Sequence, residues 1–367
     1  MSPAPKKPPR PGPALLGPKA PTARAATDRV ATDQAVTDQA VTDQAQTADA
    51  PSADAPRPSP DGPGQYKAGF VAIIGAPNAG KSTLMNRYLG QKVAIVSSKP
   101  QTTRHRILGV VTQPEAQLIF WDTPGVHESN KTLNQEMVSK ALSAMADSDV
   151  CLFLVDGERR DQAHDKALET VKARKDMPLI VAINKADLIG PEKLTQIIEE
   201  LREQTSPDRL LAVSAKTGRG LKKLKKFLVS FLPDSPPLYD EDTLTDQSLR
   251  AITAEYVREA VFELTHQEIP YSTAVTVDEF REPKAGDKNP LYRLSVTVHV
   301  ERESQKKVMI GRGGQMLRQI GQKARLRLEA FLETKVFLSI FVRITDHWTE
   351  DRRTLADFGY LDTKDKD

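Results

Sequence analysis

One segment of eight residues constrains the fold of this chain more than any other. It reads G-A-P-N-A-G-K-S and lies between an apolar run at 70–74 and an amphipathic run at 83–89. Its residues are Gly75, Ala76, Pro77, Asn78, Ala79, Gly80, Lys81 and Ser82. This pattern between a strand and a helix is typical of a phosphate-binding loop, whose backbone N–H groups surround a polyanion. We therefore predict that the loop binds a nucleotide, with Lys81 at the β- and γ-phosphates and the Ser82 hydroxyl on Mg²⁺.

Two later segments predict which base is bound. An N-K-A-D tetrapeptide closes an apolar run and comprises Asn184, Lys185, Ala186 and Asp187. The Asp187 carboxylate matches two adjacent N–H donors of guanine that adenine lacks, and a buried carboxylate without donors is costly. The next apolar run ends in Ser214, Ala215 and Lys216, which suit a backbone N–H contact to guanine O6. A helix-capping turn is the alternative for N-K-A-D alone, but beside a phosphate loop the pattern favours GTP or GDP.

Two further segments predict how the phosphates and the metal are held. A third apolar run, 116–121, is followed by Asp122, Thr123, Pro124 and Gly125. Asp122 fits a place beside Mg²⁺, and the Gly125 N–H fits a contact to the γ-phosphate in a loop that orders around GTP. The segment Q-T-T-R-H-R before this strand offers a threonine as a second magnesium hydroxyl, and we prefer Thr103 over Thr102. A basic surface loop is the alternative for that segment.

The predicted chemistry is GTP hydrolysis, with Lys81, Thr103 and Gly125 as catalytic residues. Val126, also predicted to lie at the nucleotide, follows Gly125. In many GTPases a glutamine at this place orients the attacking water, which valine cannot do. The Asn78 amide oxygen is a candidate ligand for a monovalent cation beside the phosphates, so K⁺ is a hypothetical second ion.

The composition changes after residue 232. Three prolines at 233, 236 and 237 interrupt a helical pattern, and an acidic stretch follows, so residues 233–245 are predicted to be an interdomain linker. From 246 to 360 the patterns run helix, strand, strand, helix, G-x-x-G, helix, strand. This order matches a type II KH domain, whose loop clamps about four single-stranded nucleotides. We therefore predict a small α+β domain that binds RNA.

The distribution of charge agrees with RNA binding. Residues 302–343 contain ten Lys/Arg and three Glu, a balance of +7, whereas the whole chain carries +3. Such a concentration of cations is typical of a surface that contacts phosphates. An ordinary helix–helix turn beside a solvated lysine face is the alternative. The predicted RNA-binding residues are Lys306, Lys307, Gly311, Arg312, Gly313, Gly314 and Arg318.

Together these motifs resemble the Era family of GTPases, in which a GTPase domain precedes a C-terminal KH domain. The resemblance is carried by G-A-P-N-A-G-K-S, P-Q-T-T-R-H-R, D-T-P-G-V-H, N-K-A-D, S-A-K and I-G-R-G-G-Q, within residues 67–360. It implies a small-ribosomal-subunit assembly factor whose KH domain binds single-stranded RNA near the 3′ end of the small-subunit rRNA. It also implies peripheral association of some members with the cytoplasmic side of the inner membrane. Arg312 stands where lysine is common in the family, which affects the phosphate geometry.

The two ends of the chain differ from the rest. Residues 1–65 contain thirteen of the twenty-six prolines, and their seven basic residues are balanced by seven Asp. Large apolar residues are scarce there, so we predict a disordered tail, with a transit peptide as the alternative. Residues 361–367 are predicted to be a polar tail. The single cysteine, Cys151, and the lack of an apolar run of about 20 residues suit a cytoplasmic protein.

The predicted architecture is a doubly wound α/β sheet over residues 66–232, followed by the linker and the KH domain. We expect a monomer. Two other classes of function stay open. One is a GTPase whose basic second domain docks a protein or a membrane surface. The other is an RNA-binding scaffold that binds nucleotide without turnover.

Overall fold

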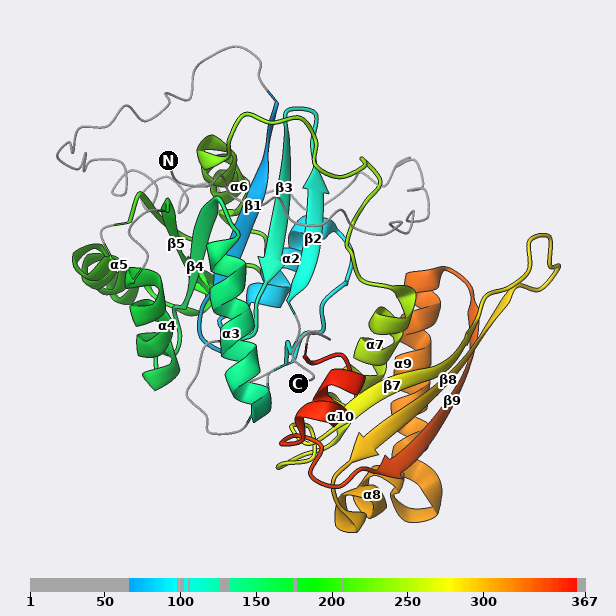
Figure 1. Cartoon of the computed structure of the whole chain (residues 1–367). Helices are drawn as coiled ribbons and strands as arrows, with labels where there is room; N and C mark the ends of the chain where they lie inside the picture. The colour runs from blue at the N-terminus through cyan, green and yellow to red at the C-terminus, as the bar shows by residue number, and fades with distance from the viewer. Residues whose placement is uncertain are drawn as a thin grey trace, which may run out of the picture.

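A computed structural model describes residues 66–97, 99, 102–104, 106–125, 132–173, 177–205 and 207–361. Figure 1 shows two domains, the first built on a six-stranded sheet and the second on a three-stranded sheet. The predicted disordered tail lies outside the described residues, as does Val126. Within the described part of the chain, no helix is both long enough and apolar enough to span a bilayer.

The first domain has the predicted doubly wound architecture. Its strands are β1 (Lys67–Ile74), β2 (Ile107–Thr112), β3 (Ala116–Asp122), β4 (Val150–Asp156), β5 (Leu179–Asn184) and β6 (Arg209–Ala212). They are ordered β2-β3-β1-β4-β5-β6, with β2 antiparallel to β3 and the other neighbours parallel. The helices are α2 (Lys81–Leu89), α3 (Thr132–Ala146), α4 (Gln162–Lys172), α5 (Pro191–Thr205), α6 (Leu221–Phe231) and the 3₁₀ turn η1 (Ala186–Leu188).

Helices cover both faces of this sheet, which explains why its strands read as apolar runs. Every residue of β3 and β4 is buried, including Cys151 at 2% exposure. Helix α6 packs Leu221, Leu224 and Leu228 into the core on one face. Helices α3, α4 and α5 contribute to the core on the other face. A sheet wound in this way brings the carboxyl ends of its parallel strands to one edge, where ligands bind.

The second domain follows the predicted order of elements. They are α7 (Leu249–Leu264), β7 (Ala274–Arg281), β8 (Leu291–Val300), α8 (Glu303–Ile310), η2 (Arg312–Gly314), α9 (Gln315–Leu332), β9 (Lys335–Ile344) and α10 (Arg352–Asp357). Strand β8 lies between an antiparallel β7 and a parallel β9. Helices α7 and α9 bury the apolar side of this sheet. The topology is that of a type II KH domain.

The boundary segments are more tightly packed than the sequence indicates. In the predicted linker, Pro233 and Leu244 accept backbone hydrogen bonds from Ala68 and Val110 of the first domain. The linker therefore lies along that domain. Leu361 was expected to begin a polar tail, but it is buried at 4% exposure. It belongs to an apolar cluster that sequence patterns did not predict, formed by Leu133, Met137, Ala274, Trp348, Leu355, Ala356, Tyr360 and Leu361.

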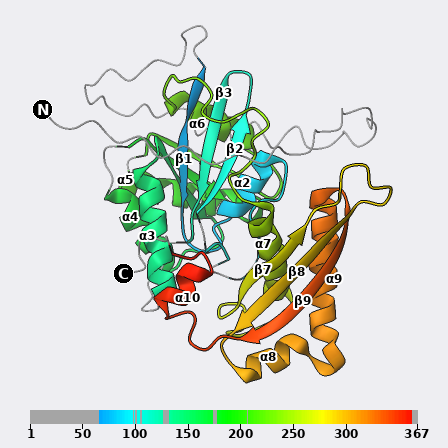
Figure 2. The ribbon, with the colours of Figure 1, turned by 45° about the vertical axis from the view of Figure 1, so that its right-hand side comes forward.

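This cluster joins the two domains. It brings residues of α3 from the first domain against α10 and the C-terminal segment of the second. Figure 2, turned from the first view, also places α10 beside the end of α3. The domains therefore share a buried interface in addition to the covalent linker.

Candidate nucleotide site and RNA-binding loop

A cavity of about 650 Å³ opens at the carboxyl edge of the first sheet. Most of the predicted nucleotide residues line it: Ala76, Pro77, Asn78, Gly80, Lys81, Ser82, Gly125, Asn184, Lys185, Asp187, Ser214, Ala215 and Lys216. The others within the described residues do not line it themselves: Gly75, Ala79, Asp122, Thr123, Pro124 and Ala186. Segments separated by more than a hundred residues thus meet around one space.

The phosphate loop is held by its own lysine in this structure. Lys81 Nζ donates to the carbonyl oxygens of Gly75 at 3.0 Å and Ala76 at 2.9 Å. The side chain is 5% exposed, and burial lowers the pKa of Lys81 to about 8. A bound polyphosphate would stabilise the charged form of this lysine and raise that pKa again. Two carbonyl oxygens therefore stabilise the Lys81 cation only in part, since its pKa stays below the ordinary value.

The three predicted metal ligands bring their side-chain oxygen atoms close together. Ser82 Oγ donates to Asp122 Oδ2 at 2.6 Å and lies 2.9 Å from Thr103 Oγ1. Thr102 instead donates its hydroxyl to the Lys99 carbonyl oxygen, so the geometry favours Thr103. Asp122 Oδ1 is buried without a hydrogen-bond partner, and burial raises the pKa of Asp122 to about 6. Two hydroxyls and a carboxylate with an unsatisfied oxygen fit a hard cation such as Mg²⁺.

The D-T-P-G segment, residues 122–125, packs directly on the phosphate loop. A Cβ at Gly125 would lie 2.6 Å from the backbone nitrogen of Pro77, so no larger residue fits without a shift. Thr123 anchors the segment by donating its hydroxyl to the Ile73 carbonyl oxygen at 2.7 Å. The Gly125 backbone consequently lies directly against the phosphate loop.

Asn184 joins the base-reading segments to the phosphate loop. Its Nδ2 donates to the Ala79 carbonyl oxygen at 2.7 Å, and its Oδ1 accepts from the Ala215 amide at 2.9 Å. A Cβ at Gly80 would lie 2.3 Å from the same Nδ2, which explains the glycine. Asp187 is exposed within the cavity, where its carboxylate is accessible to a base.

Sequence reasoning missed three acidic residues that line this cavity, Asp156, Glu158 and Asp161, and Asp156 contacts a predicted residue. Asp156 ends β4 and lines the cavity, and its Oδ2 accepts from Lys185 Nζ at 2.6 Å. Its Oδ1 accepts from the backbone amides of Glu158 at 2.9 Å and Arg159 at 3.2 Å. Asp156 thus fixes the lysine of the N-K-A-D segment to the neighbouring strand. The sequence signal for Asp156 was its position at the end of an apolar run. Asp122 and Asn184 each end an apolar run in the same way.

The segment that contains Thr103 is anchored in the second domain. Arg104 is 3% exposed and donates to the carbonyl oxygens of Thr273 and Tyr271, each at 2.7 Å. Arg258 of α7 in turn donates to the Thr102 carbonyl oxygen. The residues on both sides of the Thr103 hydroxyl therefore contact the second domain.

The predicted RNA-binding loop is open. Gly311, Gly313 and Gly314 all have positive φ, at 71°, 54° and 76°, and a Cβ at Gly314 would meet no atom within 4 Å. Among the described residues, none therefore blocks a phosphate from approaching the backbone at Gly314. Lys307 and Arg312 are exposed beside it, whereas Arg318 donates to the Gly313 carbonyl oxygen and so braces the loop.

Part of the predicted basic surface is engaged in ion pairs within the protein. Lys323 and Arg327 of α9 both pair with Glu263 of α7. Arg327 also lies 2.9 Å from Glu259, which is fully buried and pairs with Lys92 of the first domain. These ion pairs link α9 to α7 and α7 to the first domain, so these two cations also support helix packing and the domain interface.

Family comparisons match the two domains separately. Residues 70–185 match the family described as 50S ribosome-binding GTPase, and residues 268–349 match the KH domain family. The first range contains the phosphate loop, and the second contains the G-x-x-G loop. Both predicted domain types are confirmed.

Relatives match over nearly their whole length. GTPase Era of Geotalea uraniireducens (strain Rf4) is 44% identical over 296 residues, which covers 81% of this chain and 98% of the relative. GTPase Era of Nostoc sp. (strain PCC 7120 / SAG 25.82 / UTEX 2576) is 41% identical over 304 residues, which covers 82% of this chain and 92% of the relative. The similarity therefore spans both domains in one alignment.

Solved structures agree with these matches. A crystal structure of an Aquifex aeolicus Era variant bound to GDP and AlF₄⁻ has a TM-score of 0.76 and 38% identity, covering 80% of this chain and 99% of that one. A crystal structure of Era with MgGDPNP and nucleotides 1506–1542 of 16S ribosomal RNA has the same TM-score and identity. The match covers 81% of this chain and 99% of that one. The fold similarity thus includes the arrangement of a nucleotide site and a KH domain in one chain.

Proposed function

This chain belongs to the Era family of GTPases, and from that premise we propose that it is a GTP-hydrolysing switch that binds small-subunit rRNA through its KH domain during ribosome assembly. A relative of the same fold binds nucleotides 1506–1542 of 16S ribosomal RNA, which supports single-stranded RNA near the rRNA 3′ end as the ligand. The observation that carries the proposal is the segment 102–104, which contacts the metal-ligand set on one side and the KH domain on the other.

The residues around the cavity suit binding and hydrolysis of GTP. Mg²⁺, when bound by Ser82 and Thr103 beside Asp122, supplies positive charge at the β- and γ-phosphates. Lys81 contributes a second positive charge, and the Gly125 N–H donates to the γ-phosphate in this proposal. Asp187 orients the nucleotide through guanine, so water attacks a phosphate that is held in line.

A monovalent cation is proposed to replace the missing glutamine. Asn78 lines the cavity within the phosphate loop and has a left-handed backbone, with φ at 64°. Its amide oxygen is a suitable ligand for K⁺ beside the phosphates, where charge stabilises the transition state. Hydrolysis should therefore be faster in KCl than in NaCl of the same concentration. Equal rates in the two salts, measured by phosphate release, would remove K⁺ from the mechanism.

The second domain is proposed to respond to the nucleotide. A γ-phosphate and Mg²⁺ that engage Thr103 would restrain its neighbours Thr102 and Arg104, and these contact Arg258, Tyr271 and Thr273. The GTP state would then favour one arrangement of the KH domain, and hydrolysis would release it. We further propose a cytoplasmic monomer that associates peripherally with the inner membrane; these properties rest on the family resemblance alone.

The G-x-x-G loop provides the test of RNA binding. A carboxylate introduced by Gly314→Asp would repel the phosphates and would strain a backbone at φ 76°. Affinity for an RNA matching the 3′ end of the small-subunit rRNA should fall below detection, while GTP hydrolysis by the same protein persists. Unchanged RNA affinity would indicate that the basic domain docks a protein or membrane surface instead. Absence of phosphate release from the unmodified protein would indicate a scaffold without turnover.

A further inference from the structure

Two phenylalanines of β9 are exposed on the side of the KH sheet away from its helices. Phe337 is 54% exposed and Phe341 is 60% exposed. Their neighbours Leu338, Ile340 and Val342 point to the other side and pack in the core with α7 and α9. The fold therefore uses alternate residues of β9 for its core, and the two phenyl rings are not needed for it. Two exposed aromatic side chains on one side of a strand are therefore a candidate interaction site.

Cations surround these rings. Across the sheet Arg293 pairs with Phe337 in register, and its guanidinium lies 5.8 Å from the ring centre. Lys335 and Arg343 are exposed on the same side of β9. We define the aromatic strip as Arg293, Lys335, Phe337, Ser339, Phe341 and Arg343. Its three cations and lack of a carboxylate give it a charge complementary to a polyanion.

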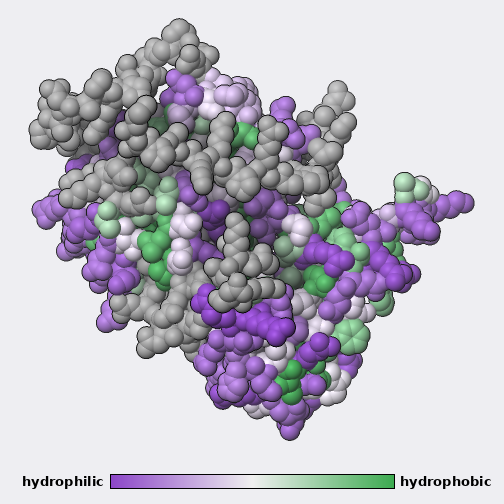
Figure 3. Space-filling view, in the orientation of Figure 1, coloured by the Kyte–Doolittle hydropathy of each residue, from purple (hydrophilic) through white to green (hydrophobic). Residues whose placement is uncertain are grey.

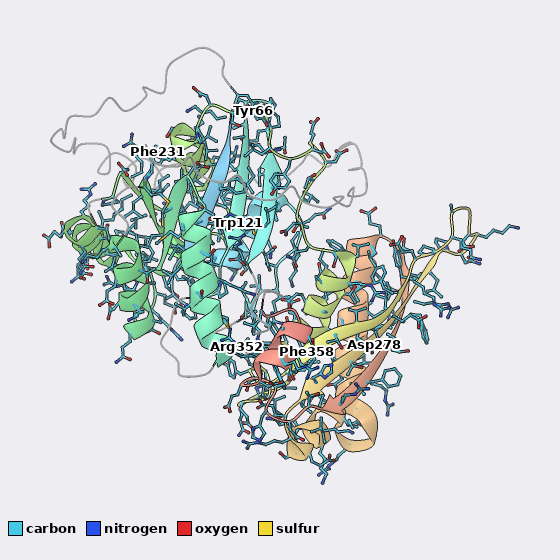
Figure 4. All side chains as sticks on the ribbon, in the orientation of Figure 1. Tyr66, Trp121, Phe231, Asp278, Arg352 and Phe358 are labelled. Carbon is cyan, nitrogen blue, oxygen red and sulfur yellow. The ribbon has the colours of Figure 1, made fainter. Side chains whose placement is uncertain are left out.

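The acidic groups of this face lie on β7, which β8 separates from β9. Thr297 of β8, which Asp278 contacts, is in register with Phe341. Asp278 accepts from the Thr297 hydroxyl at 2.7 Å, and Glu279 pairs with Arg281. Helix α10 covers this part of the sheet, where Phe358 packs 4.4 Å from the His299 ring, ring centre to ring centre. Figure 4 labels Asp278 and Phe358, and the face of the domain that Figure 3 shows is mostly hydrophilic with hydrophobic spots. The open part of the face is therefore the aromatic strip.

The shape of the strip suits stacked bases. Ser339 lies between the two rings on β9 and faces Ser295 on β8, so only small side chains separate them. Four residues of strand place the rings about 13 Å apart along β9, which leaves each ring free to take its own base. Sheets that present aromatic rings flanked by cations bind single-stranded RNA by stacking, and each stacked base contributes about 1–3 kcal/mol.

The strip also continues from the G-x-x-G loop. Strand β9 is the edge strand of the sheet, and its carboxyl end lies beside α8, which leads into the loop, in both Figures 1 and 2. Phe341 is nearer to that end than Phe337. We propose that the aromatic strip is a second RNA subsite, on which bases flanking the nucleotides held by the G-x-x-G loop stack. This inference rests on the proposed RNA binding and adds to it a subsite of defined chemistry.

The test removes the aromatic rings and retains the apolar surface. Phe337→Leu, Phe341→Leu and the double variant are compared with Phe341→Trp, which keeps a stacking ring, and with Leu142→Ala, an exposed apolar residue of the first domain. Affinity is measured by fluorescence anisotropy for a ten-nucleotide RNA matching the rRNA 3′ end. A series of the same RNA with single abasic positions is measured in parallel.

We expect each leucine variant to lose about five- to a hundredfold in affinity, while Phe341→Trp and Leu142→Ala retain it. Abasic positions at the bases that stack on the strip should weaken the unmodified protein and have no further effect on the double variant, because the stacked partner is already gone. Abasic positions at the G-x-x-G loop should weaken both proteins. Equal affinity of the double variant and the unmodified protein would overturn the subsite and leave the G-x-x-G loop intact as the RNA site. The subsite would also be overturned if the double variant lost binding to anionic vesicles while its RNA affinity stayed unchanged. Failure of the unmodified protein to bind RNA would instead overturn the proposed function and the subsite together.

Discussion

At the scale of single residues, the nucleotide site is a set of groups whose charges are only partly satisfied without a ligand. Burial lowers the pKa of Lys81 to about 8 and raises the pKa of Asp122 to about 6. Lys81 is thus still mainly a cation, and Asp122 mainly an anion, near pH 7. Binding of Mg²⁺ and GTP needs both of these charged forms.

The first prediction is a pH window for binding. Below pH 6 Asp122 gains a proton and binds Mg²⁺ less well, and above pH 8 Lys81 loses the proton that the phosphates require. Affinity for GTP with Mg²⁺ should be highest between these values and fall by up to about tenfold per pH unit outside them. Calorimetry in buffers of different ionisation enthalpy should show proton uptake on binding above pH 8. Flat affinity from pH 6 to 9.5, without proton uptake, would contradict this assignment.

The second prediction concerns Asp156, which fixes Lys185 by a 2.6 Å contact. Asp156→Asn keeps the size of the side chain and removes the charge, so GTP affinity should fall by about 5- to 30-fold. The rate at saturating GTP should stay the same, because Asp156 does not reach the phosphates. Asp161 lines the same cavity but caps α4, and Asn caps a helix as well as Asp does, so Asp161→Asn should leave both the melting temperature and the GTP affinity nearly unchanged. If the effects of Asp156→Asn and Lys185→Ala simply add, the two residues do not act together.

At the scale of elements, the strands, the helices and the nucleotide motifs were predictable because their signals are local. A phosphate loop requires eight consecutive residues between a strand and a helix, and the KH domain requires one order of elements. The cluster around Trp348 and α10 was not predictable, because it forms between segments about 200 residues apart. Arg104 was predicted as part of a nucleotide loop, and only the structure shows that its side chain is buried in the other domain.

The third prediction concerns this junction. Arg104→Ala leaves buried carbonyl oxygens of Tyr271 and Thr273 without a donor, so the free energy of unfolding should fall by about 2–4 kcal/mol. RNA affinity should then be the same with GDP and with a non-hydrolysable GTP analogue.

Arg106 is the matched control for this change. It belongs to the same segment, but its partners are in the first domain. Its guanidinium carbon lies 3.8 Å from the centre of the Trp121 ring, and it pairs with Asp147. Arg106→Ala should therefore preserve the difference in RNA affinity between the nucleotide states. A difference that survives in Arg104→Ala would show that the two domains communicate by another route.

At the scale of the whole molecule, the structure joins a guanine-nucleotide site to an RNA-binding domain through one short segment and a shared apolar cluster. The linker lies along the first domain, and the interface contains the buried groups Arg104, Arg258 and Glu259. Such an interface has few intermediate positions, so a change at Thr103 is expected to shift the KH domain between discrete arrangements. The central claim is that GTP controls RNA affinity in this way.

The most direct test measures affinity for a labelled single-stranded RNA matching the 3′ end of the small-subunit rRNA. Binding is compared with GDP and with a non-hydrolysable GTP analogue over a series of salt concentrations, with a scrambled RNA as control. We predict tighter binding with the analogue, specific over the scrambled RNA, and a salt dependence that reports a few phosphate contacts in both states. Weak binding that ignores both the RNA sequence and the nucleotide would contradict the account.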